Sequence, residues 1–267
     1  MLKRFLKPVR SLMQRAGFDI VRYRKPVADD ATSVRIESAD AAIAEAVAPY
    51  TMTSPERIQA TIDAVRYVCR YRIPGSLVEC GVWRGGSTMA MAKTLLDEGD
   101  TGRDLFLFDT FEGMSPPTDH DRDHTGASAA QLLGNTSRNE NWLWCYAALD
   151  EVRANLAKTG YPMERFHLVP GKVEETIPHA GLAGPIAVLR LDTDWYESTR
   201  HELMHLFPLL APGGVLIVDD YGYWRGARRA VDEFLAANPD VPLLLQRTDF
   251  TGRMAVKPRL LDGTSHS

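Results

Sequence analysis

Short apolar runs alternate along most of this chain with longer segments of helical periodicity. The apolar runs lie at residues 77–80, 104–109, 166–169, 186–191 and 215–218, and the periodic segments lie at about 88–96, 147–159, 196–210 and 225–237. Strands that are apolar throughout and alternate with helices are typical of a parallel sheet covered on both faces. Residues 241–246 and 254–256 predict a closing antiparallel pair. The pattern therefore predicts a doubly wound, mostly parallel α/β sheet of seven strands.

Residues 1–50 stand outside this alternation. Apolar residues at the spacing of one helix face run from Leu2 to Ala16, with cations on the other face, which predicts a basic amphipathic helix ending near Gly17. Residues 26–50 then form a linker that leads into a short Ala-rich helix. We therefore divide the chain into an N-terminal extension (1–50), a main domain (51–260) and a disordered tail (261–267).

The main domain opens on a helix start. Thr53 and Glu56 have the spacing of a capping box, and Pro55 suits the first helical turn. An apolar stripe follows, and we expect the helix to end before Pro74.

Residues 112–142 form a long polar interruption of the alternation, and we call this segment the lid. It contains Met114-Ser115-Pro116-Pro117 and the polar run 119–124. A polar insertion of this length in a compact domain is usually functional. We expect the lid to cover the active site and to determine the acceptor.

Charge is unevenly distributed along the chain. Residues 1–25 contain eight Lys and Arg residues and one acid, Asp19, so their net charge is +7. Because the whole chain has a net charge of −4, the remaining residues carry −11. An acidic body is a poor partner for nucleic acid, because phosphate contacts need clustered cations. The basic helix either attaches to an anionic membrane surface or docks on its own domain or on a second subunit, and the sequence leaves both open.

The cysteines and the N-terminus bear on location. Cys69, Cys80 and Cys145 are widely spaced and form no CxxC pair, which argues against a zinc site or a disulfide framework. Cations interrupt the apolar residues of the N-terminus, so it does not resemble a signal peptide. We expect a cytoplasmic homo-oligomer that can attach to the inner face of the membrane.

A Gly-rich turn follows the first strand of the main domain. Residues 78–87, VECGVWRGGS, form a strand, a turn and a helix start, where the backbone can approach a ligand closely. The turn lacks the GxGxxG spacing and the phosphate-loop lysine, so alone it does not identify the ligand. Asp109 ends the second strand about 30 residues after Glu79, where an acid can accept both ribose hydroxyls. An adenosine-type ligand is therefore expected, with nicotinamide and S-adenosylmethionine both still open.

Carboxylates end two further strands. One strand ends in Asp192-Thr193-Asp194 and the next in Asp219-Asp220. Ligands in doubly wound sheets bind at the carboxyl ends of the strands, so these acids should converge beside the adenosine site. Crowded carboxylates require a cation or a proton, and oxygen ligands favour Mg²⁺, with Ca²⁺ or Mn²⁺ as alternatives. The alternative is a set of strand-end caps that face water.

Five sequence blocks together resemble a known enzyme family. They are VECGVWRGGS (78–87), FDTFEGM (108–114), PGKVEETIP (170–178), LRLDTDWYEST (189–199) and PGGVLIVDDYGYWRGARRAVDEF (212–234). In their order and in their residues, these blocks resemble the macrocin O-methyltransferase family, the metal-dependent sugar O-methyltransferases of macrolide and aminocoumarin biosynthesis. The resemblance spans about residues 50 to 258 and leaves the N-terminal basic helix outside. It implies a Rossmann-like class I methyltransferase fold, S-adenosylmethionine as cofactor, a magnesium or other divalent ion, and a sugar-containing small-molecule acceptor.

The resemblance also assigns roles to residues. Glu79, Gly81 and Ser87 fall on the first cofactor motif, Asp109 on the ribose-binding acid with Thr110 beside it, and Gly171, Lys172 and Val173 where the adenine would lie. Asp192, Asp219 and Asp220 match the metal ligands, and Asp194 matches the proposed general base. The metal would stabilise an alkoxide, while Asp194 takes its proton.

Other interpretations stay open at this point. A catechol-type methyltransferase would need the same chemistry, and a non-catalytic adenosine-binding protein would leave the acids unexplained. A dehydrogenase is disfavoured, because no Tyr-x-x-x-Lys or catalytic His arrangement stands near the site. His201 and His205 are four apart on a helix but have no evident third metal ligand. Finally, Trp195, Tyr196, Tyr221 and Tyr223 flank the acids and either wall the acceptor pocket or pack in the fold.

Overall fold

The structure is a computed structural model of the chain, and it describes residues 38–135, 141–182 and 184–259. The predicted basic helix and the predicted C-terminal tail lie outside the described residues. Within the described ranges, no helix is long and apolar enough to cross a membrane.

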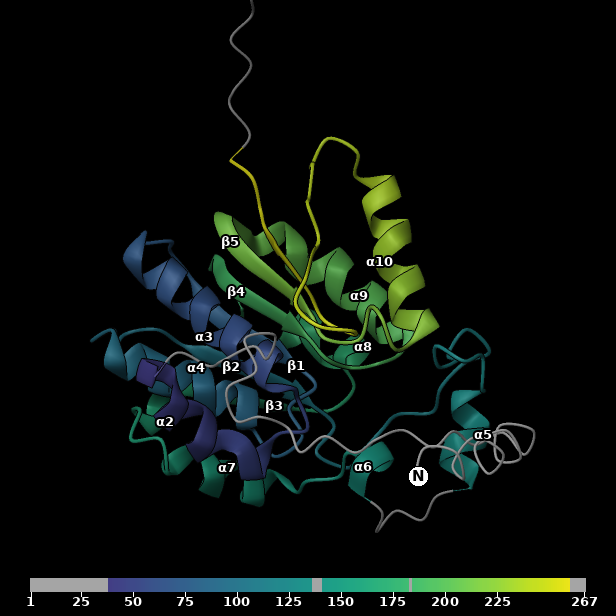
Figure 1. Cartoon of the computed structure of the whole chain (residues 1–267), viewed down its shortest axis with the longest axis horizontal. Helices are drawn as coiled ribbons and strands as arrows, with labels where there is room; N and C mark the ends of the chain where they lie inside the picture. The colour runs from purple at the N-terminus through teal and green to yellow at the C-terminus, as the bar shows by residue number, and fades with distance from the viewer. Residues whose placement is uncertain (1–37, 136–140, 183, 260–267) are drawn as a thin grey trace, which may run out of the picture. The chain divides into compact units, whose positions relative to one another are not determined.

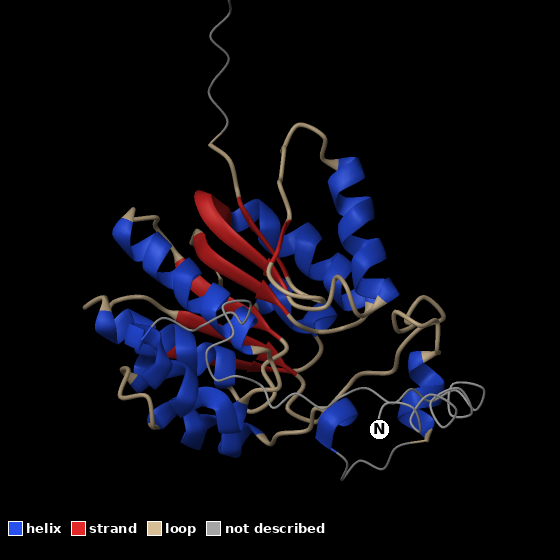
Figure 2. Ribbon diagram, viewed as in Figure 1, coloured by secondary structure: helices blue, strands red, loops and turns tan. Residues whose placement is uncertain are grey.

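A sheet of seven strands lies between two layers of helices (Figures 1 and 2). The strands are β1 (Ser76–Cys80), β2 (Leu105–Asp109), β3 (Phe166–Pro170), β4 (Ile186–Leu191), β5 (Leu210–Val218), β6 (Gln246–Arg247) and β7 (Arg253–Val256). Their order in the sheet is β3-β2-β1-β4-β5-β7-β6, with β7 antiparallel to β5 and to β6 and the other neighbours parallel. The predicted fold class is therefore confirmed.

Helices cover both faces of the sheet. On one side lie α2 (Ser38–Val47), α3 (Pro55–Arg70), α4 (Gly86–Asp97) and α7 (Leu149–Ala157), and on the other α8 (Val173–Thr176), α9 (Tyr196–Leu206) and α10 (Arg225–Ala237) (Figure 1). The lid contains α5 (Ala129–Gly134) and α6 (Asn141–Trp144), which stand apart from the sheet. Short 3-10 helices η1 (Ala48–Tyr50), η2 (Met163–Arg165), η3 (Ile177–His179) and η4 (Phe207–Leu209) complete the connections.

Side chains alternate between two apolar cores, as strand geometry requires. Leu77 of β1 packs toward the α3 and α4 layer, whereas Val78 and Cys80 pack toward α8, α9 and α10. Two charged residues interrupt this pattern in the middle of the sheet, Glu79 on β1 and Arg190 on β4. They are register partners on adjacent strands and are 2% and 1% exposed. The sheet therefore carries a buried charged pair directly below the carboxyl ends of its strands.

Three local expectations differ from the structure. The predicted strand at 241–246 is wrong except at its end, because Pro242 lacks an N–H donor and the strand begins only at Gln246. The N-cap of α3 is Ser54, whose hydroxyl accepts from the Arg57 amide at 3.2 Å, and the hydroxyl of Thr53 instead accepts from Arg190 at 3.1 Å. Finally, α2 contributes Ile43 and Val47 to the core, so the compact part of the chain includes residues before position 51.

Candidate active site

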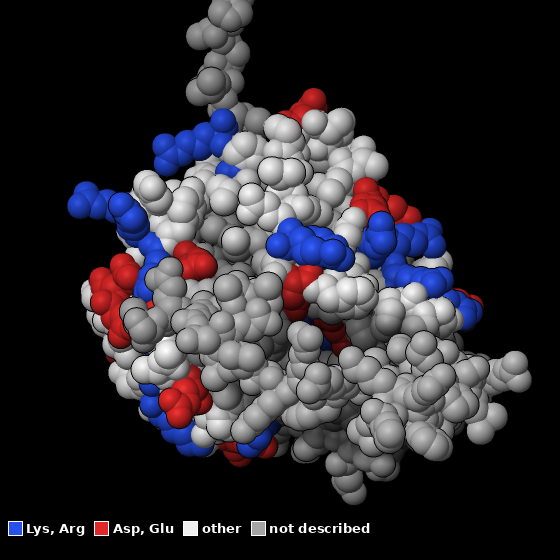
Figure 3. Space-filling model, viewed as in Figure 1, with Lys and Arg blue, Asp and Glu red and all other residues white. Residues whose placement is uncertain are grey.

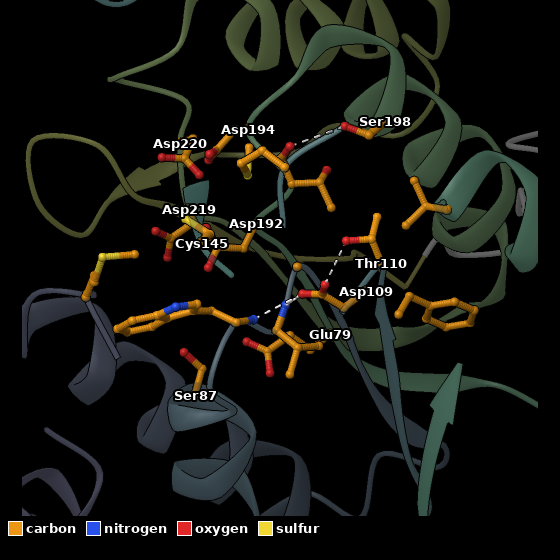
Figure 4. A pocket seen from close by; sticks show the side chains of 18 of the residues that line it. Glu79, Ser87, Asp109, Thr110, Cys145, Asp192, Asp194, Ser198, Asp219 and Asp220 are labelled. Atoms are coloured by element: carbon orange, nitrogen blue, oxygen red, sulfur yellow. Dashed lines mark hydrogen bonds between the residues drawn. The ribbon is translucent and has the colours of Figure 1, made fainter. Parts of the chain in front are cut away.

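A pocket of about 370 Å³ opens at the carboxyl ends of the parallel strands. All twelve residues to which the sequence assigns a role line it: Glu79, Gly81, Ser87, Asp109, Thr110, Gly171, Lys172, Val173, Asp192, Asp194, Asp219 and Asp220. Figure 4 labels all of them except Gly81, Gly171, Lys172 and Val173. They come from five separate stretches of the chain. The fold thus brings the predicted cofactor residues and the predicted acidic residues into one cavity, whereas their individual roles stay predictions.

Glycines let the first strand end close to its neighbour. Gly81 has a φ of 81°, and a Cβ at this position would collide with the backbone oxygen of Asp192. Gly85 is the N-cap of α4, with a φ of 92°. A side chain is therefore excluded where the end of β1 meets β4.

Asp109 connects two loops of the pocket. Its carboxylate accepts from the amides of Val82 at 2.6 Å, Trp83 at 3.1 Å and Phe111 at 2.7 Å. Burial raises the pKa of Asp109, and these three hydrogen bonds oppose the rise. Its backbone oxygen also accepts from the amide of Gly171 at 2.9 Å. The residue predicted to bind ribose is thus fixed by the backbone of both neighbouring loops.

Arg190 is a central residue of the site that the sequence interpretation missed. Its guanidinium donates to Glu79 at 2.7 Å and to Asp192 at 2.7 Å, and it also pairs with Asp219. Burial raises the pKa of Glu79 to about 7, although the positive charge of Arg190 acts in the other direction. The signal was present in the sequence, because Arg190 is the only charged residue in the apolar run 186–191.

Arg57 is a second residue that the sequence interpretation missed. It lies on α3, lines the pocket, and pairs with both Asp219 and Asp249, the latter at 2.9 Å. Both oxygens of Asp219 therefore accept from arginines, one from Arg57 and one from Arg190. Nothing in the spacing of the chain relates Arg57 to Asp219, which are 162 positions apart.

Three acids form a cluster, and one of them, Asp192, also pairs with Arg190. Ligand oxygens of Asp192, Asp194 and Asp220 all lie within 4.8 Å of one another. The structure thus groups the predicted base, Asp194, with two predicted metal ligands, Asp192 and Asp220 (Figure 4). The third predicted ligand, Asp219, pairs with Arg57 and Arg190. The Oδ2 atom of Asp220 is buried and has no hydrogen-bond partner among the described residues.

The electrostatics of this cluster favour a bound proton or a bound cation. Burial raises the pKa of Asp194 to about 7, and repulsion from Asp192 contributes to the rise. Burial, together with repulsion from Asp194 and Asp192, also raises the pKa of Asp220 well above its usual value. Grouped carboxylates with an unpartnered buried oxygen fit a hard divalent ion such as Mg²⁺.

His201 and His205 do not form a comparable cluster. Their rings stack on α9 with centroids 4.0 Å apart, and they belong to no group of three metal-ligand side chains among the described residues. Burial lowers the pKa of His201.

The described part of the lid closes one side of the pocket. Met114, Ser115 and Leu143 line the cavity, and a small apolar core joins the lid to Trp195 and Trp224. Residues 136–140 of the predicted lid lie outside the described residues. Met114 and Ser115 of the lid thus line the site, whereas the expectation that the lid covers it and determines the acceptor stays a prediction.

Some of the aromatic residues that flank the acids line the pocket, and others pack in the fold. Tyr223 lines the pocket, together with Trp83 and Trp224, which the sequence interpretation did not select. By contrast, Trp195 is 2% exposed and packs under the lid. Tyr221 is half-buried, with the guanidinium groups of two arginines over its ring.

Comparison with known proteins decides the family. The family model of macrocin O-methyltransferase (TylF) matches residues 8–254. The chain belongs to the macrocin O-methyltransferase family. It is therefore an S-adenosylmethionine-dependent O-methyltransferase. Because the match begins at residue 8, the expectation that the basic helix lies outside the family region was wrong.

Curated relatives and a solved structure agree with this membership. A tetracenomycin-pathway rhamnosyl 4'-O-methyltransferase of Streptomyces olivaceus is 37% identical over 185 residues, covering 69% of this chain and 67% of the relative. Demethyldecarbamoylnovobiocin O-methyltransferase of Streptomyces niveus is 33% identical over 187 residues, covering 70% and 68%. The structure of the O-methyltransferase NovP superposes with a TM-score of 0.67 at 30% identity, covering 79% of this chain and 83% of NovP.

Proposed function

We propose that this protein uses a divalent metal, with Mg²⁺ as the physiological ion, to transfer a methyl group to a sugar hydroxyl of a glycosylated metabolite. The observation that carries the proposal is the cluster of Asp192, Asp194 and Asp220 in the same pocket as the Gly-rich turn. Of the relatives named above, one is named for a rhamnosyl-bearing tetracenomycin and the other for demethyldecarbamoylnovobiocin, and the first name includes a sugar. A sugar with neighbouring hydroxyls offers two oxygen ligands to one metal ion.

The cofactor would lie across the ends of β1, β2 and β3. Glu79, Gly81 and Ser87 face its methionine portion, Asp109 and Thr110 its ribose, and Gly171, Lys172 and Val173 its adenine. In support, all eight line the cavity on the side of these strands, and the amide of Gly171 donates to the backbone of Asp109. The sulfonium methyl would then point toward the acidic cluster.

The metal would be held by Asp192, Asp219 and Asp220. Support is strongest for Asp192 and Asp220, which share the cluster, and the unpartnered oxygen of Asp220 offers a free ligand atom. Asp219 can serve as the third ligand while it accepts from Arg57 and Arg190, because each carboxylate oxygen has two lone pairs. When bound, the ion supplies charge that lowers the pKa of the acceptor hydroxyl.

The protein's own groups supply the remaining chemistry. Asp194 lies within the cluster and would take the hydroxyl proton, because a carboxylate beside the acceptor hydroxyl can act as a general base. Arg190 and Glu79 hold the strand ends in place beneath the acids. The lid residues Met114 and Ser115 would exclude water and orient the acceptor.

We also propose a cytoplasmic homo-oligomer that the basic N-terminal segment attaches to anionic membrane surfaces. The sequence alone supports this part, through the charge of +7 on residues 1–25.

A screen of acceptors tests the function. Purified protein is incubated with methyl-labelled S-adenosylmethionine and panels of glycosylated metabolites, free sugars and catechols, each with and without Mg²⁺. We expect label to enter sugar-bearing acceptors only when Mg²⁺ is present. Transfer confined to catechols would overturn the sugar assignment. Cofactor binding without transfer to any acceptor would favour a non-catalytic role.

A further inference from the structure

Asp194 occupies a strained turn. Its φ is 67°, in the left-handed region that non-glycine residues rarely adopt. The amide of Trp195 donates to the carbonyl of Thr193 at 2.8 Å, which closes the turn around Asp194. Such a conformation persists only where the surrounding structure holds it. The position of Asp194 therefore depends on groups outside the turn.

One such group comes from the lid. The amide of Tyr196, the first residue of α9, donates to the Oδ1 atom of Asp121 at 2.8 Å. The N-cap residue of α9, Trp195, makes no side-chain capping hydrogen bond. The first turn of a helix needs external acceptors, and a carboxylate there also interacts favourably with the helix dipole. Asp121 thus caps α9 from a position 75 residues earlier in the chain.

Asp121 also accepts hydrogen bonds from other residues of the lid. Its other carboxylate oxygen accepts from the amide and the hydroxyl of Thr118, at 2.7 Å and 2.9 Å. Its backbone oxygen accepts from the amide of Ala129, at the start of α5, at 2.9 Å. The side chain is fully buried. Asp121 therefore links the fold of the lid to the start of α9.

Helix α10 also leaves room for the contact between Asp121 and Tyr196. A Cβ at Gly226, in the first turn of α10, would collide with the Oδ1 atom of Asp121 and come within 3.1 Å of the Tyr196 amide. Glycine in a helix normally costs stability relative to alanine. The absence of a side chain at Gly226 thus gives Asp121 the room it needs.

We propose that Asp121 is a positioning residue for methyl transfer, which ties the lid to the start of α9 and so holds the strained turn that presents Asp194. Because Asp194 carries the proton transfer in the proposed function, this inference rests on that function. Asp121 itself does not line the pocket, so it contacts the site through Tyr196 and the turn that precedes it.

Three variants test the contact. In Asp121→Ala the turn loses its external support, and we expect kcat to fall about 10²-fold, the loss that a displacement of about 1 Å can cause. KM for the acceptor and calorimetric affinities for S-adenosylmethionine and Mg²⁺ should stay close to wild type. Asp121→Asn keeps one oxygen and can accept from Tyr196 or from Thr118 but not from both, so it should recover part of kcat. Asp119→Ala, the same change at an exposed lid position, is the matched control and should retain wild-type kcat.

A double-mutant cycle with Gly226 tests the same contact from α10. Gly226→Ala alone should lower both kcat and the melting temperature, because the new methyl group displaces Asp121. In the Asp121→Ala background the same substitution should lower the melting temperature much less, because the collision with the carboxylate is gone and the gain in helix propensity offsets the close approach to the Tyr196 amide. This second arm needs no acceptor, and it keeps the test valid if Asp121→Ala folds poorly.

The outcomes separate this inference from the proposed function. If wild-type protein transfers methyl groups and both Asp121 variants match it in kcat, the positioning role is wrong. A fall in Mg²⁺ or cofactor affinity equal to the fall in kcat would also overturn it, because Asp121 would then merely maintain the fold. If wild-type protein transfers no methyl group at all, the proposed function fails, and the melting temperatures of the cycle still report on the contact.

Discussion

Asp219 and Asp220 are consecutive in the chain, yet they face different partners. Asp219 accepts from Arg57 and Arg190, whereas Asp220 joins Asp192 and Asp194 and keeps a buried oxygen without a hydrogen-bond partner among the described residues. Successive residues at the end of a strand point to opposite sides, so this division follows from backbone geometry. One acid anchors the site to the buried arginine, and the other is available to a cation.

The buried arginine should be needed for stability. Arg190→Met leaves the buried Glu79 without a counter-charge and Asp219 with Arg57 alone, and we expect a loss of about 3–5 kcal/mol in the free energy of unfolding. Denaturant titration of metal-free and cofactor-free protein measures it. Arg229→Met removes an exposed helix pair with Glu233 and should change stability little. Equal stability of the two variants would show that Arg190 is not the anchor described here.

The proposed base can be separated from the proposed ligands. Asp194→Asn should lower kcat by roughly 10²–10⁴-fold, the usual contribution of a general base, while Mg²⁺ and S-adenosylmethionine still bind. Isothermal titration calorimetry on the variant measures both affinities. Because Asp194 lies in the acidic cluster, a lost Mg²⁺ affinity would instead make it a ligand and leave Asp219 bound only to its arginines.

Metal binding should depend on pH in a defined direction. The pKa of Asp194 is raised from 3.8 to about 7, so in metal-free protein the folded state retains a proton that the unfolded state releases. This group therefore stabilises the metal-free fold at low pH, and its contribution is lost as pH rises from about 4 to 7. A cation must displace that proton below pH 7 but not above it.

The gain in melting temperature caused by a fixed concentration of Mg²⁺ should consequently be larger at pH 8 than at pH 6. Thermal melts at both values, each with Mg²⁺ and with EDTA, measure the gain. In Asp194→Asn the difference between the two pH values should shrink. A gain that is larger at pH 6 would contradict the direction derived from the cluster.

The sequence predicted the helices and strands better than it predicted the partners of individual side chains. Periodicity located β1 to β5, and α10 matches its predicted range of 225–237, because burial on both faces leaves unmixed apolar runs. Strand ends also located the acids, since parallel strands end at one edge. The pattern failed at residues 241–245, where apolar residues pack without pairing as a strand.

Partners that lie far apart in the chain could not be predicted from local sequence patterns. Arg57 and Asp219 are 162 positions apart, and Asp121 and Tyr196 are 75 apart, so no local spacing relates them. Asp121 of the lid can cap α9 only because the lid, α9 and α10 pack together at Gly226. Pairings of this kind are decided by tertiary structure, even when each member is visible in the sequence.

The basic N-terminal segment has two opposite interpretations that one truncation separates. Residues 1–25 carry a charge of +7, and each cation near an anionic membrane surface contributes about 1 kcal/mol that salt weakens. We expect intact protein to co-sediment with phosphatidylserine vesicles at low salt, and protein lacking residues 1–25 to remain in the supernatant with an unchanged melting temperature. If the truncation lowers the melting temperature and intact protein ignores the vesicles, the segment belongs to the fold.

The most direct test of the central claim is the rate of methyl transfer in the presence and absence of a chelator. If the acidic cluster holds the metal that activates the acceptor, EDTA should abolish turnover and excess Mg²⁺ should restore it. Asp220→Asn should then lower kcat/KM by at least about 10²-fold, a loss of about 2.7 kcal/mol of transition-state stabilisation. Full activity of the wild-type protein in EDTA would contradict the account.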